Sequence, residues 1–105
     1  MLSNSRSIGY LGLKISTVTN EIAKNYSLPL GVYIKSVEMD SPAIAAGLQS
    51  GDVITAIDGN EMLTVEQYEQ YVRKLTPGSD VEITIMRQGQ EDYVEIKCQA
   101  QAGVL

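Results

Sequence analysis

The residues best placed to do chemistry follow one another near the start of the chain, in the run Gly9-Tyr10-Leu11-Gly12-Leu13-Lys14-Ile15-Ser16. A turn with glycine between bulky aliphatic residues can aim several consecutive backbone N–H groups at one point, which suits a carboxylate. Leu11, Leu13 and Ile15 then alternate with Lys14 and Ser16 at the two-residue spacing of a half-buried strand. The run therefore predicts an anion-binding loop followed by a strand whose edge can receive an extended peptide.

Other kinds of chemistry find little support in the composition. The chain contains no histidine, which removes Ser-His-Asp and Cys-His catalysis and the usual zinc sites. Its single cysteine, Cys98, alternates with Val94 and Ile96, so we expect a small buried apolar side chain. The carboxylates are scattered over predicted turns and helix faces. We therefore expect no catalytic residues, no metal and no cofactor.

Length and net charge further limit the kinds of protein that this chain can be. A chain of 105 residues suits a single domain with one core, and its six tyrosines must carry the aromatic packing because Phe and Trp are absent. The net charge of −5 argues against nucleic acid as a partner. No apolar run approaches the roughly 20 residues of a membrane helix, and no signal peptide is visible at the N-terminus.

Alternation and capping signals predict a β-rich α+β domain with five to six strands and two to three helices. We expect strands at about 8–16, 32–38, 53–57, 81–85 and 93–98. Helices are expected from Thr19 or Asn20 to Tyr26, directly after Ser41, and from Thr64 to about Leu75. The predicted organisation is a flexible N-terminal segment at 1–7, the domain at 8–99 and a flexible C-terminal tail at 100–105, with loosening from about Gln99.

Several of these runs resemble PDZ domains. The loop Tyr10-Leu11-Gly12-Leu13 resembles their carboxylate-binding loop, and a longer stretch is similar in Ser41-Pro42-Ala43, Ala46-Gly47-Leu48, Gly51-Asp52-Val53-Ile54 and Ile57-Asp58-Gly59. The aromatic residue at the start of the loop and the short helix ending in Asn25-Tyr26-Ser27-Leu28-Pro29 resemble the PDZ domains of bacterial HtrA-type serine proteases. The order of the parts, with the loop first and the 93–98 strand last, looks like the circularly permuted bacterial arrangement. The resemblance covers about 8–99, without a protease domain.

This resemblance implies a partly open β-barrel or sandwich that binds peptides by strand addition. It implies that the terminal carboxylate of the peptide meets Tyr10, Leu11, Gly12 and Leu13, with Arg6 adding positive potential. It further implies that Lys14, Ile15, Ser16, Val65, Glu69 and Val72 line the peptide strand and its pocket. Along the 64–75 helix, periodicity alone leaves open one broad core face or two separate stripes. The resemblance favours the split, with Tyr68, Tyr71 and Leu75 in the core.

The expected partners are C-terminal peptides of proteins with an apolar last residue. The chain itself ends in Val104-Leu105, so Leu105 of a neighbouring copy is a further candidate ligand. The resemblance implies a substrate-recognition or regulatory domain of an HtrA-like protease that acts outside the cytoplasm. The alternatives are a PDZ module of another membrane-associated protease or secretion component, and a structural or oligomerisation domain.

Overall fold

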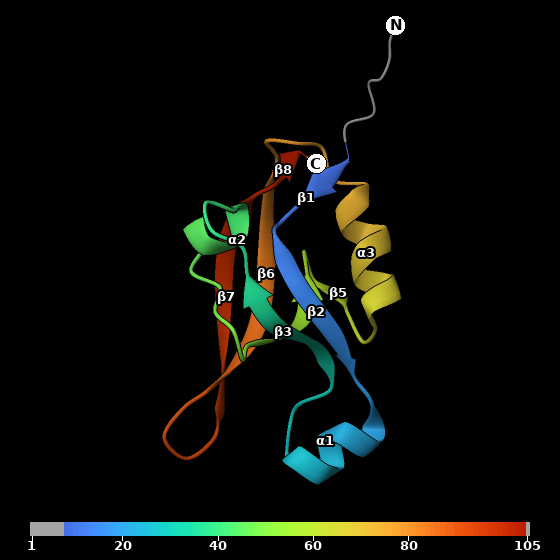
Figure 1. Ribbon diagram of the computed structural model, residues 1–105, viewed down its shortest axis with the longest axis vertical. Coiled ribbons are helices and arrows are strands. Elements are labelled where there is room, and N and C mark those ends of the chain that lie inside the picture. Colours follow the sequence, from blue (N-terminus) through green and yellow to red (C-terminus); the bar gives the residue numbers. More distant parts are fainter. Residues whose placement is uncertain (1–7, 105) are drawn as a thin grey trace, which may run out of the picture.

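One antiparallel sheet dominates residues 8–104, the part of the chain that the computed structural model describes (Figure 1). In chain order the elements are β1 (Gly9–Tyr10), β2 (Leu13–Val18), α1 (Asn20–Tyr26), β3 (Gly31–Val37), α2 (Pro42–Ala45), β4 (Val53–Ile57), β5 (Asn60–Glu61), α3 (Val65–Arg73), β6 (Asp80–Gln88), β7 (Tyr93–Gln101) and β8 (Gly103–Val104). The strands of the sheet follow the order β2-β3-β4-β6-β7 with β5 added to β4, while β1 and β8 form a separate two-stranded ribbon. The prediction of a β-rich α+β domain with a partly open sheet is confirmed.

Side-chain caps fix where the helices begin. The side-chain oxygens of Thr19, Ser41 and Thr64 accept the backbone N–H three residues on, at 3.2, 3.2 and 3.1 Å. Each bond satisfies one of the N–H groups that a helix start leaves without a partner. Pro42 occupies the first turn of α2, where its fixed φ suits a helix start. The predicted helix starts are therefore confirmed, although α3 ends at Arg73, earlier than expected.

The core is formed by the sheet together with residues of α2 and α3. Its fully buried aliphatic side chains come mainly from β3, β4 and β6, and they include Ile34, Ile54, Ile57, Ile83 and Ile85. Each such side chain contributes about 1.5–3 kcal/mol relative to exposure. Cys98 joins this cluster, as its alternation predicted. This packing gives β2 and α3 a firm support.

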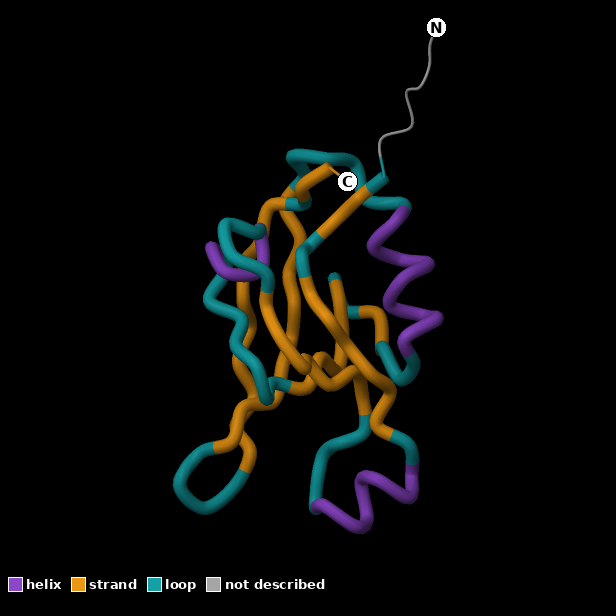
Figure 2. The backbone as a smooth tube through the Cα atoms, viewed as in Figure 1, coloured by secondary structure: helices purple, strands orange, loops and turns teal. Residues whose placement is uncertain are grey.

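The helices occupy different sides of the sheet. In Figure 1, α3 lies beside β2, α2 lies beside β7, and α1 lies at one end together with the turn between β6 and β7. The ribbon of β1 and β8 lies at the opposite end, as the tube in Figure 2 also shows. Because β2 is the first strand of the sheet, one of its edges pairs with β3 and the other faces α3.

The first predicted strand, 8–16, is divided in the structure. β1 ends at Tyr10 and β2 begins at Leu13, with Gly12 at φ +87° between them. This backbone angle cannot continue a strand, and glycine adopts it without steric cost. The chain therefore turns at the predicted anion-binding loop, and β2 then runs on to Val18, beyond the predicted end at Ser16.

The predicted flexible tail is wrong for the residues described. β7 continues to Gln101, and β8 pairs with β1 in the register Gly9↔Val104 and Tyr10↔Gly103. The sequence signal was weak because β8 has only two residues and its partner lies at the far end of the chain. Residues 1–7 and Leu105 lie outside the described part of the chain.

Candidate functional site

The turn between β1 and β2 is held from one side by two backbone hydrogen bonds. The Ala43 amide donates to the Leu11 carbonyl and the Glu38 amide donates to the Gly12 carbonyl, each at 2.9 Å. In a planar trans peptide group, the N–H points opposite to the C=O. The N–H groups of Gly12 and Leu13 therefore point away from Ala43 and Glu38, into the space between the loop and α3.

Gly12 is also packed closely against the start of α2. A methyl group at Gly12 would overlap the Cβ of Ser41, lie 2.9 Å from its Oγ and lie 3.2 Å from the Tyr10 hydroxyl. The Tyr10 hydroxyl donates a hydrogen bond to Glu38, and this bond is the main cause of a raised pKa for Tyr10. A side chain at Gly12 would therefore point at the start of α2 and not into the space between the loop and α3.

Helix α3 runs antiparallel to β2. Its first turn is attached to the end of β2, because the Val65 N–H donates to the Thr17 Oγ1 at 3.0 Å. Its last turn packs on β1, where a methyl group at Gly9 would collide with the backbone carbonyls of Val72 and Leu75. The C-terminal end of α3 therefore lies beside the loop.

A hollow of about 130 Å³ opens between the loop and the last turns of α3. It is lined by Ile8, Gly9, Tyr10, Leu11, Gly12, Leu13, Tyr68, Glu69, Val72 and Arg73. Tyr68 and Val72 are 6% and 5% exposed and belong both to this lining and to the core. Burial, with a smaller effect from Glu69, raises the pKa of Tyr68 well above its ordinary value. The hollow thus joins backbone N–H groups, a mostly apolar wall and one acidic and one basic side chain.

The structure brings together six of the predicted site residues. These are Tyr10, Leu11, Gly12, Leu13, Glu69 and Val72. Lys14, Ile15 and Val65 do not line this hollow, and Ser16 borders a different cavity. Arg6 lies outside the described residues.

The split of α3 into two stripes is wrong in one respect. Tyr68 and Val72 are four residues apart and so share one helix face, which serves the core and the hollow together. Tyr71 is only half-buried, and its hydroxyl donates to Asp58 Oδ2 at 2.6 Å. The sequence also missed Arg73, whose position one turn after Glu69 was the signal that could have found it.

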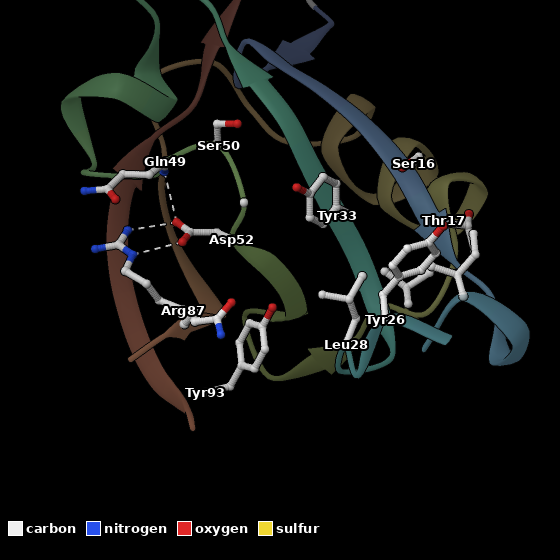
Figure 3. A pocket seen from close by; sticks show the side chains of 14 residues that line it. Ser16, Thr17, Tyr26, Leu28, Tyr33, Gln49, Ser50, Asp52, Arg87 and Tyr93 are labelled. Carbon is white, nitrogen blue, oxygen red and sulfur yellow. Dashed lines mark hydrogen bonds and ion pairs between the residues drawn. The ribbon is translucent and has the colours of Figure 1, made fainter. Parts of the chain in front are cut away.

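A larger cavity of about 610 Å³ lies among β2, β3, α1 and the β6–β7 hairpin (Figure 3). Its charged groups are already paired, as the dashed lines of Figure 3 show. Arg87 donates to both oxygens of Asp52 at 2.9 and 2.8 Å, and the backbone N–H of Gln49 donates to the same carboxylate. Asp52 is 1% exposed. A buried charge held in this way ties the β6 strand to the turn before β4, so this ion pair is structural.

Two further features of residues 8–104 limit the chemistry. No three Cys, Asp or Glu side chains of this part gather in a way that could hold a metal ion. None of its helices is long and apolar enough to cross a membrane. Of the described cavities, the hollow beside the loop alone offers the N–H groups of the predicted anion site.

The chain is similar in sequence to a known protein family and to named relatives. Residues 9–98 match the family model described as PDZ domain. The chain is 32% identical over 94 residues to a probable periplasmic serine endoprotease DegP-like of Halomonas elongata, and 34% identical over 91 residues to one of Hahella chejuensis. These matches cover 88% and 85% of this chain but 20% and 19% of the relatives, so the chain spans about a fifth of their length.

Solved structures agree with this fold. The HtrA-type protease AlgW with decapeptide superposes with a TM-score of 0.81 at 30% identity, covering 94% of this chain and 30% of that one. The HtrA3 PDZ domain bound to a phage-derived ligand superposes with a TM-score of 0.77 at 19% identity, covering 95% and 89%. The family match extends over most of the chain and includes the loop, β2 and α3. The chain therefore belongs to the PDZ domain family and is a peptide-binding module rather than a catalytic domain.

Proposed function

We propose that the domain captures the free C-terminal ends of proteins between β2 and α3. The extended ligand pairs antiparallel with the edge of β2 that faces α3, and its carboxylate accepts hydrogen bonds from the loop amides. The observation that carries this proposal is the pair of hydrogen bonds that the Leu11 and Gly12 carbonyls accept on the side of the loop away from the hollow. They aim the next two N–H groups at the hollow before any ligand arrives, which lowers the cost of ordering the site.

The lining of the hollow favours an apolar last residue. Leu11, Leu13, Tyr68 and Val72 are among its lining residues. An apolar cavity of about 150 Å³ can hold benzene, so the hollow of about 130 Å³ suits one aliphatic side chain. Lys14, Ile15, Ser16 and Val65 extend along β2 and α3 beyond the hollow, and we assign them to the preceding residues of the ligand.

The affinity expected from these contacts is modest. Hydrogen bonds to a charged group contribute about 1.5–3 kcal/mol each, and burial of the last side chain contributes a similar amount. Loss of free motion and ordering of the peptide offset much of this gain. We expect a dissociation constant in the micromolar range, which corresponds to a binding free energy on the order of −7 to −8 kcal/mol.

The test is calorimetric titration with octapeptides that end in Val, Leu or Ile, each made with a free carboxylate and with a C-terminal amide. The amidated peptide lacks the negatively charged carboxylate to which the loop N–H groups donate, so we expect it to bind at least tenfold more weakly, which is about 1.4 kcal/mol. Equal affinity for acid and amide, or no binding of any acid peptide, would contradict the proposed mode.

The relatives suggest where this capture operates. They are named periplasmic serine endoproteases, so we propose that the domain selects or senses substrates for an HtrA-type protease outside the cytoplasm. A parent of another class, such as a membrane-associated protease or secretion component, is distinguished by the sequence that precedes this domain. A trypsin-like domain carrying His, Asp and Ser there would support the first assignment.

The tail of a neighbouring copy remains a less favoured ligand within this proposal. Val104 is paired with Gly9, so the residues up to Val104 would have to leave β1 before they could pair with β2 of another molecule. A concentration-independent molar mass at micromolar concentrations would agree with external peptides as the ligands.

A further inference from the structure

Arg73 is the last residue of α3 and lies beside the hollow between the loop and α3. It lines the hollow together with the loop residues, and it is the sole cationic residue among the lining residues described. Its Nη2 lies 3.3 Å from Glu69 Oε1, and the two side chains are 68% and 48% exposed. The guanidinium is therefore held near the loop by a single weak partner.

A carboxylate would otherwise enter an unfavourable electrostatic field at this place. The whole chain carries a net charge of −5. The C-terminal end of α3 lies beside the loop and carries the negative end of the helix dipole. Glu69 adds a full negative charge to the same lining. The two loop amides act against all three, so a cation at this position changes the balance directly.

Other described cations are poorly placed for this role. Arg87 is committed to Asp52 in the other cavity. Lys14 is exposed on β2 and does not line the hollow, and Lys74 borders a cavity on a different face of α3.

We propose that Arg73 is the charged partner of the ligand carboxylate, and that Glu69 competes with the ligand by pairing with Arg73 in the free domain. A guanidinium offers several N–H donors in a fixed fork, so it can bind a carboxylate with two bonds. An exposed pair one helical turn apart is weak, so giving up Glu69 costs little. This inference rests on the proposed function and deepens it, because it makes Arg73 and Glu69 opposing controls on affinity for a free C-terminus.

The test compares Arg73→Gln with Lys74→Gln by calorimetry, using the octapeptides ending in Val, Leu or Ile in acid and amide forms. Both variants remove one cation near the C-terminal end of α3, so net charge changes alike, and Arg73→Gln removes in addition only the exposed pair with Glu69. We expect Arg73→Gln to weaken the acid peptide about tenfold and leave the amide within twofold, whereas Lys74→Gln changes neither by more than twofold. Arg73→Lys should recover part of the loss, since it restores the charge without the fork.

A second pair of variants acts in the opposite direction. Glu69→Gln frees Arg73 and removes a repulsive charge, so we expect acid peptides to bind about three- to tenfold more tightly. Glu66→Gln, on the exposed first turn of the same helix, is the control and should have little effect. Equal affinities of Arg73→Gln and Lys74→Gln for the acid peptide, with the wild-type acid preference intact, would overturn the role of Arg73 alone. If the wild type bound acid and amide peptides equally well, the proposed function would be overturned as well.

Discussion

Replacing Gly12 with alanine tests how the loop is positioned. Gly12 has φ +87°, and a side chain there meets both the backbone strain of this angle and the start of α2 at Ser41. The strain costs about 1–2 kcal/mol for a residue with a Cβ, and overpacking of a tight contact costs about 1–3 kcal/mol. The expected loss in the free energy of unfolding is about 2–5 kcal/mol, a large part of the roughly 5–15 kcal/mol typical of a domain.

Gly47→Ala is the matched control. Gly47 has φ +88°, yet a methyl group there has no neighbour within 4 Å. Its loss should therefore be the strain alone, about 1–2 kcal/mol. Urea unfolding followed by circular dichroism separates the two variants, since a difference of about 2 kcal/mol moves the midpoint by about 1 M.

A second substitution isolates the contact with Ser41. Ser41→Gly removes the Cβ and Oγ that Gly12→Ala would strike, and glycine at an N-cap costs only a few tenths of a kcal/mol. In this background the loss caused by Gly12→Ala should fall to that of Gly47→Ala. Losses for Gly12→Ala that equal those of Gly47→Ala in the natural background would refute the packing argument. An undiminished loss in the Ser41→Gly background would refute it too.

Three further changes test other parts of the fold by urea unfolding. Arg87→Leu leaves the buried carboxylate of Asp52 with the backbone N–H of Gln49 as its remaining partner, so we expect the free energy of unfolding to fall by about 2–4 kcal/mol. The control Lys97→Leu, at an exposed position, should lower it by less than about 0.5 kcal/mol. Equal losses for the two variants would contradict this role of the ion pair. Because burial raises the pKa of Tyr68, its neutral form is favoured in the folded state, and that stability is present below about pH 10 and lost as pH rises further. Tyr68→Phe should therefore lose less stability than the wild type between pH 8 and pH 11, and parallel losses would count against the burial of this phenol. Removing residues 103–105 deletes the partner of β1 and should cost about 1–2 kcal/mol through its lost hydrogen bonds, whereas an unchanged midpoint would mean that the ribbon contributes nothing.

Features that depend on a few neighbouring residues were predictable from the sequence. Thr19, Ser41 and Thr64 cap helices where expected, because a cap needs only its own oxygen and an N–H three residues on. The break at Gly12 and the alternation along β2 likewise follow from local backbone freedom and side-chain spacing. The location of the candidate site was therefore readable from the loop and from its resemblance to a family.

What the tertiary structure decided are the relations between segments distant along the chain. The position of Ser41 determines that a side chain at Gly12 would strike α2, and the docking of α3 antiparallel to β2 brings Arg73 to the loop. Periodicity gives the faces of a helix but not the angle at which it lies on the sheet, so it could not show that Tyr68 and Val72 serve both core and hollow. The pairing of β8 with β1 joins the two ends of the domain. Two residues are too few to show the alternation that predicts a strand. They form one only because the rest of the fold brings a partner strand close to them.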